Sequence, residues 1–97
     1  MREYLIRADE DEGWIAVHVN DLARMLTPHG WGAVAMEGWG DHRLRLGGTE
    51  LSFSGEAPGW HVAFEGEISP ETADAAIETI ARQLAEHAGR SVSWFKL

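Results

Sequence analysis

Two different spacings of apolar residues occur along this chain. Between residues 43 and 65, apolar and polar residues alternate, which is typical of strands with one buried face. From residue 70 to 88, apolar residues recur every three or four positions, which is typical of a helix with one buried face. A chain that contains both patterns buries its apolar surface by packing helix on sheet, so the sequence predicts an α+β fold.

The helical stretch carries signals for both of its ends. Ser69 is a favourable N-cap, Pro70 suits the first helical position, and Gly89 suits the position after the last turn. The apolar face consists of Ala73, Ala76, Ile77, Ile80, Leu84 and Ala88. We therefore predict a helix over 70–88 that packs closely on a sheet, with its two isoleucines buried.

Six strands are expected around the helices. Residues 33–36 begin a run of four strands with glycine-rich turns, which predicts an antiparallel meander over 32–66. Residues 3–8 and 91–97 are rich in strand-forming residues and add one strand near each end of the sequence.

Residues 14–27 fit two kinds of secondary structure. The alternation of β-branched residues over 15–19 favours a strand. A helical count instead places four apolar residues on one face, and only Val17 breaks that pattern. These four residues are Ile15, Val19, Leu22 and Leu26. We predict a helix over 12–27 with Val17 facing solvent; the alternative is an N-terminal β-hairpin around 9–13.

The expected order of elements is β-α-β-β-β-β-α-β, in a single α+β domain over residues 1–97. We predict an antiparallel or mixed sheet of about six strands, with both helices packed on one face. The chain contains no cysteine, which excludes disulfides and thiolate chemistry.

The chain is strongly acidic. Sixteen Asp and Glu residues against eight Lys and Arg residues give a formal net charge of −8. This charge repels nucleic acid and anionic membranes and attracts a basic protein. The sequence shows neither the apolar core of a signal peptide nor a membrane-spanning segment. We therefore expect a cytoplasmic protein with a basic protein partner, and neither nucleic acid nor membrane as a partner.

Residue types that support catalysis or metal binding do not form recognised motifs. The five histidines are scattered, and only the sheet would bring His42 and His61 together. The consecutive carboxylates of 9–12 lack the alternating ligand positions of a calcium loop. Neither a Gly-x-Ser-x-Gly elbow nor a phosphate-binding loop occurs. We expect no enzymatic activity, catalytic residue, metal or cofactor.

Four of the five tryptophans directly follow a glycine, which permits turns where a large ring must be placed. We expect Trp14, Trp60 and Trp94 to lie in the core. Trp31 and Trp39 flank the 32–37 strand from glycine-rich turns, and we expect both to be partly exposed. An exposed tryptophan beside acidic residues is a good interface anchor, and we expect Trp39 to be one.

Together, the charge and the tryptophans predict a module that docks on a basic protein surface. Short acidic α+β proteins recur among toxin-immunity proteins and phage-encoded inhibitors, and this class-level analogy makes an inhibitor or immunity-type protein the first hypothesis. The expected contact residues are Glu10, Asp11, Glu12, Glu37, Trp39 and Asp41. One alternative is an accessory or regulatory domain that forms a homodimer through a sheet edge at 91–97. Another is a small-molecule binder that uses a Trp-lined face.

Overall fold

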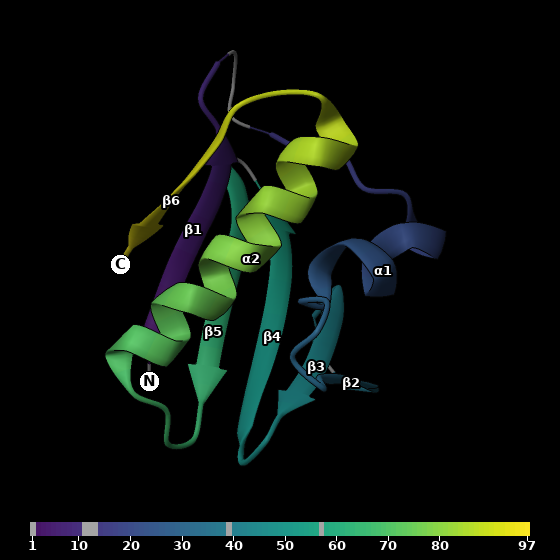
Figure 1. Cartoon of the computed structure of the whole chain (residues 1–97). Helices are drawn as coiled ribbons and strands as arrows, with labels where there is room; N and C mark the ends of the chain where they lie inside the picture. Colours follow the sequence, from purple (N-terminus) through teal and green to yellow (C-terminus); the bar gives the residue numbers. More distant parts are fainter. Residues whose placement is uncertain (1, 11–13, 39, 57) are drawn as a thin grey trace.

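The computed structural model describes residues 2–10, 14–38, 40–56 and 58–97. Within these residues, six strands form one antiparallel sheet, and two helices cover one of its faces (Figure 1). The strands are β1 (Arg2–Ala8), β2 (Val34–Met36), β3 (His42–Leu46), β4 (Thr49–Glu56), β5 (Gly59–Glu65) and β6 (Val92–Lys96). The helices are α1 (Leu22–Leu26) and α2 (Pro70–Ala88). The predicted α+β class and element order are confirmed.

The strands lie in the order β2-β3-β4-β5-β1-β6 across the sheet. Strands β2 to β5 form the expected meander, and β1 is inserted between β5 and β6, so that Ile6 lies opposite both Trp60 and Trp94. The pairing of β1 with β6 extends to Leu97, whose N–H donates to the carbonyl of Glu3 at 2.9 Å. The short strand β2 and strand β6 are therefore the two edges of the sheet.

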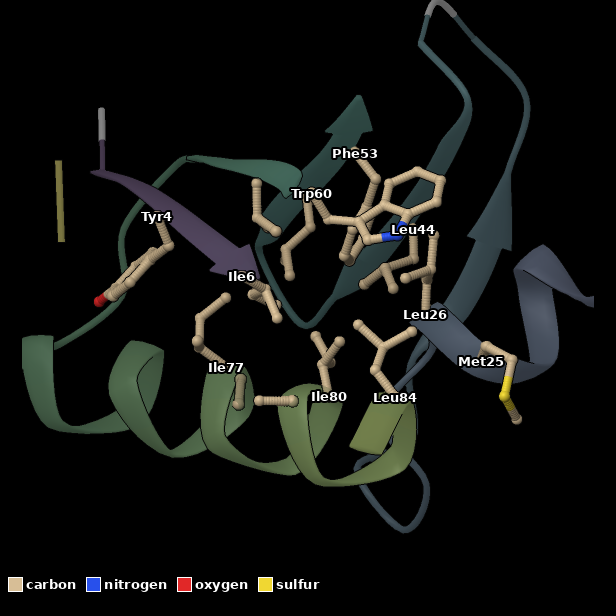
Figure 2. Close-up of a cluster of buried hydrophobic side chains, with 14 of the residues drawn as sticks. Tyr4, Ile6, Met25, Leu26, Leu44, Phe53, Trp60, Ile77, Ile80 and Leu84 are labelled. Carbon is tan, nitrogen blue, oxygen red and sulfur yellow. The ribbon is translucent and has the colours of Figure 1, made fainter. Parts of the chain in front are cut away.

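Helix α2 forms as the sequence predicts. The hydroxyl of Ser69 accepts from the Thr72 N–H at 3.2 Å, and Gly89 closes the helix in the left-handed conformation with φ of 65°. Ile77 and Ile80 are completely buried, and Figure 2 shows them pointing from α2 toward the strands. Ala73, Ala76 and Ala81 are buried too, which brings the helix close to the sheet, whereas Ala88 in the last turn is half-buried.

A polar cluster ties α2 to strands β1 and β6. The Tyr4 hydroxyl donates to Asp74 Oδ1 at 2.7 Å, and Lys96 Nζ lies 3.0 Å from Asp74 Oδ2. Burial and the hydrogen bond to Asp74 raise the pKa of Tyr4 to about 12. The hydrogen bonds from Tyr4 and Lys96 lower the pKa of Asp74. The cluster therefore favours a neutral tyrosine beside an ionised aspartate.

The prediction of a helix over 12–27 is wrong for most of that range. Residues 11–13 lie outside the described part, 14–18 have no regular structure, and a short 3-10 turn at Val19–Asp21 leads into the single-turn α1. The alternative is wrong too, because 14–18 do not join the sheet. Ile15 and Leu26 are buried as expected and Leu22 is half-buried.

Two valines in this segment are placed opposite to their predicted sides. Val19 is 71% exposed, whereas Val17 is half-buried and packs against the core. The physical reason lies in the backbone carbonyls. The Ile15 carbonyl accepts from the Trp60 indole and the Trp14 carbonyl from the Arg90 guanidinium, so side chains from elsewhere occupy acceptors that a helix would use internally.

Neither helix of the described residues is long and apolar enough to cross a membrane.

Candidate functional site

An open groove lies at the end of the sheet where β4 ends and β3 and β5 begin. It has a volume of about 280 Å³, and segments far apart in the sequence form its walls. The lining residues are Trp14, Val17, Val19, Leu22, Asp41, Gly55 and Trp60. Five of them are apolar and one is a carboxylate, so the groove combines an aromatic and aliphatic surface with a single negative charge.

Gly55 makes room for two stacked tryptophans in this groove. The rings of Trp14 and Trp60 lie with their centroids 5.3 Å apart and their planes at 26°. A Cβ atom at Gly55 would lie 2.7 Å from the nearest ring atom of each tryptophan. Since that distance is well inside van der Waals contact, any side chain at this position would displace the stacked pair.

The two tryptophans of the stack differ in exposure. Trp60 is 3% exposed, and its indole N–H donates to the Ile15 carbonyl at 2.9 Å, which confirms its predicted place in the core. Trp14 is 37% exposed, so its predicted burial is wrong. It packs against Trp60 and Gly55, but the segment that carries it is not a helix on the sheet and leaves part of the ring open to the groove. Trp94, predicted in the core, is half-buried, and its indole N–H donates to Glu78 Oε2 at 2.7 Å.

Asp9, Glu10 and Trp14 are hydrogen-bonded to the chain segment that follows α2. The guanidinium of Arg90 donates to the carbonyls of Glu10, at 3.0 Å, and Trp14, at 3.2 Å. The Asp9 N–H donates to the Ser91 carbonyl at 3.0 Å, and Asp9 Oδ1 accepts from the Ser93 hydroxyl. These bonds hold the backbone of Asp9, Glu10 and Trp14 in place.

Asp41 is held in a fixed position by the backbone of β4. Its Oδ2 accepts from the Gly55 N–H at 2.6 Å, and its own N–H donates to the Phe53 carbonyl at 2.9 Å. The preceding Gly40 has φ of 91°, a conformation that other residues rarely adopt. As a result, the exposed Asp41 carboxylate lies beside Gly55, against which both tryptophan rings pack.

The structure brings some of the predicted contact residues together. Asp41 lines the groove, and the backbone of Glu10 shares the Arg90 guanidinium with Trp14. Glu37 is exposed after β2 and does not line the groove. Three further predicted contacts, Asp11, Glu12 and Trp39, lie outside the described residues.

Sequence reasoning missed most of the groove. Val19 was assigned to the core, and neither Gly55 nor the aliphatic Val17 and Leu22 was considered as part of a site. One signal was available: Gly55 ends an alternating strand one short turn before the Gly59-Trp60 pair. Nothing in the sequence places that glycine under Trp14.

His42 and His61, which only the sheet could have brought together, do not meet. His42 lies on the helix-covered side, with Nε2 3.2 Å from the Thr27 hydroxyl, and burial lowers its pKa. His61 alternates with the buried Trp60 and so faces the opposite side, where it pairs with Glu3 at 2.9 Å. Over the described ranges, no three His, Asp or Glu side chains gather in a way that could hold a metal ion.

Comparison with known proteins gave no match to this chain among family models, curated proteins or solved structures.

Proposed function

We propose that this protein is a non-enzymatic binding module of the inhibitor or immunity type, which docks on a basic protein surface through the groove around Trp14. The observation that carries the proposal is the 37% exposed Trp14 ring, stacked on a buried tryptophan beside the anchored carboxylate of Asp41. A tryptophan held in place before binding is an effective interface anchor, because little conformational freedom remains to be lost.

The surroundings of Trp14 suit a protein partner. Val19 is 71% exposed at the groove, next to the half-buried Val17 and Leu22, and together they extend the apolar contact beyond the ring. The groove is shallow and open, with a volume of about 280 Å³, slightly below the usual range of enclosed small-molecule pockets. This shape favours a protein surface over a small ligand.

The charge of the chain suits a basic partner. The net charge of −8 produces a negative field that steers a positive surface toward the protein. The exposed Glu10 and Asp41 supply local negative charge near the tryptophan. In this proposal the protein acts in the cytoplasm, without a catalytic residue, metal or cofactor. Its partner is a protein rather than nucleic acid or a membrane.

The proposal is tested by parallel capture from a lysate of the source organism. The baits are the wild-type chain, Trp14→Ala, and Val34→Ala as a control in which an exposed apolar side chain is truncated elsewhere. We expect a basic protein that the wild type and the control retain and that Trp14→Ala loses.

The kinetics of the purified pair complete the test. Neutral replacements of Glu10, Asp11 and Glu12 are expected to slow association several-fold and to flatten its dependence on salt, since rim charges act mainly on the association rate. If the captured protein binds all baits equally and its association rate ignores salt, the proposal is wrong.

A second candidate function, self-association, has its own supporting observation. Strand β6 is a sheet edge, and its hydrogen bonds to β1 at Ser91 and Leu97 leave the backbone groups of Val92, Trp94 and Lys96 directed outward. Phe95 is 49% exposed beside this edge. A homodimer through β6 would form with rising concentration in analytical ultracentrifugation and be lost in Phe95→Asp, whereas a monomer at all concentrations excludes it.

A further inference from the structure

Two groups that attract cations lie next to the same glycine in the groove. Asp41 Oδ2 is 2.6 Å from the Gly55 N–H, and the six-membered ring of Trp14 is 2.7 Å from the position a Gly55 Cβ would occupy. The carboxylate and the exposed indole are therefore neighbours across a residue that has no side chain to separate them. Both are held in place, one by backbone hydrogen bonds and the other by stacking on Trp60.

Each of these groups favours a positive charge by a separate physical effect. The face of an indole carries negative electrostatic potential and is the strongest cation–π acceptor among side chains. A carboxylate forms charge-assisted hydrogen bonds that are shorter and stronger than neutral ones. Within the described part of the chain, Asp41 forms no ion pair with a lysine or arginine, and the Arg90 guanidinium, which bonds the Trp14 carbonyl, does not line the groove.

The groove lining favours a guanidinium over an ammonium group. A guanidinium is planar and weakly hydrated, so it can stack on an indole while its edge N–H groups reach a carboxylate. The ammonium of lysine is compact and strongly hydrated, and it gains less from the ring. The aliphatic stem of an arginine would cover the valines and the leucine of the wall, as long charged side chains do on apolar surfaces.

We propose that the groove is a binding site for an arginine side chain of the partner, called the arginine seat below. The guanidinium stacks on Trp14 and pairs with Asp41. This inference rests on the proposed function, because it names the group through which the basic partner is recognised. The arginine replaces solvent over the exposed part of the indole, and its stem packs on Val17 and Leu22.

The seat is tested by two-dimensional NMR titration of the intact chain with N-acetyl-L-arginine amide. We expect weak, saturable shifts centred on the Gly55 amide and the Trp14 indole N–H. N-acetyl-L-lysine amide and N-acetyl-L-norleucine amide serve as probes that keep the charge and the aliphatic stem respectively, and both are expected to bind about fivefold or more weakly.

Matched variants assign the binding to the proposed groups. Asp41→Asn keeps an oxygen for the Gly55 N–H and removes only the charge, so it is expected to weaken arginine binding about fivefold or more. Glu65→Gln removes another exposed carboxylate, which lies outside the groove, and is expected to change nothing. Equal shifts from norleucine amide, or arginine binding that Asp41→Asn leaves unchanged, would overturn the inference.

The two proposals fail in distinguishable ways. A partner that binds through Trp14 while arginine amide fails to bind overturns the arginine seat and leaves the docking function standing. Arginine amide that binds as expected, in a chain that captures no protein through Trp14, supports the seat and overturns the docking function.

Discussion

Helix α2 and residues 14–21 are held in place by different kinds of hydrogen bond. In α2 the backbone groups satisfy one another, and its ends are closed by its own neighbours, Ser69 and Gly89. In residues 14–21 two carbonyls accept from side chains far along the chain, Trp60 and Arg90. The first region is built from local contacts, whereas the second has its shape only when the rest of the protein is folded.

This difference explains where the functional surface lies. A helix over residues 14–21 would use its own carbonyls and place its apolar side chains against the sheet. The irregular path instead leaves Trp14 half out of the core and Val19 exposed. The binding groove is therefore a product of the region that depends on distant contacts.

The largest expected effect is a loss of stability in α2, the region built from local contacts. Ile77→Ala removes a completely buried side chain between α2 and the sheet, and it should lower the free energy of unfolding by about 2–5 kcal/mol. Denaturant titration measures the change, with the exposed Glu86→Gln on the same helix as the control. A loss below about 0.5 kcal/mol would show that α2 does not anchor the core.

A smaller loss of stability is expected at Gly55, where Trp14 and Trp60 pack together. Gly55→Ala forces a methyl group against both stacked rings and should cost about 1–3 kcal/mol through overpacking. Tryptophan fluorescence should also change, because the Trp14–Trp60 stack must open. Gly48→Ala is the control, since a Cβ there meets nothing within 4 Å. Equal stability of the two variants would contradict the close packing at Gly55.

The smallest effect is a change in titration rather than in the fold. Tyr4 is the sole tyrosine of the chain, so tyrosinate absorbance reports its pKa directly. We expect a value near 12 in the wild type and a lower one in Asp74→Asn, which removes the charge that opposes ionisation. An unchanged midpoint in Asp74→Asn would show that Asp74 does not influence Tyr4.

The same pair gives stability a pH dependence of known sign. The pKa of Tyr4 is raised in the folded state, so its contribution is complete below the ordinary tyrosine pKa of 10.0 and is lost as pH rises toward 12. The pKa of Asp74 is lowered, so its contribution is present above 3.8 and is lost as pH falls further. The stability difference between wild type and Asp74→Asn should therefore shrink in acid, as measured by denaturant titration at several pH values.

The sequence predicts those parts of the fold that local physics determines. Alternation defines β3, β4 and β5, and the signals at Ser69, Pro70 and Gly89 define α2 within a residue. Insertion of β1 between β5 and β6 was not predicted, because strand order depends on which edges meet and leaves no local pattern. The helical spacing of Ile15, Val19, Leu22 and Leu26 was misleading at its start, because the distant donors Trp60 and Arg90 bind the carbonyls of Ile15 and Trp14.

The groove could be predicted only in part for the same reason. Asp41 was chosen because a carboxylate beside glycines and an aromatic residue suits an interface, and the structure places it in the groove. Trp14 was assigned to the core because nothing local shows that Gly55 lies beneath its ring. The groove is formed by four separate segments of the chain, and no single segment contains enough of its residues to be recognised as a site.

The pairing of β1 with β6 also determines how the protein responds to force. Glu3 and Leu97 are hydrogen-bonded neighbours, so tension applied between these two residues pulls antiparallel partners apart at their shared end. Their hydrogen bonds are then loaded one after another, as in an opening zipper, instead of together as in shear. A chain pulled from these two points would lose β6 first and at low force, while the meander of β2 to β5 stays closed.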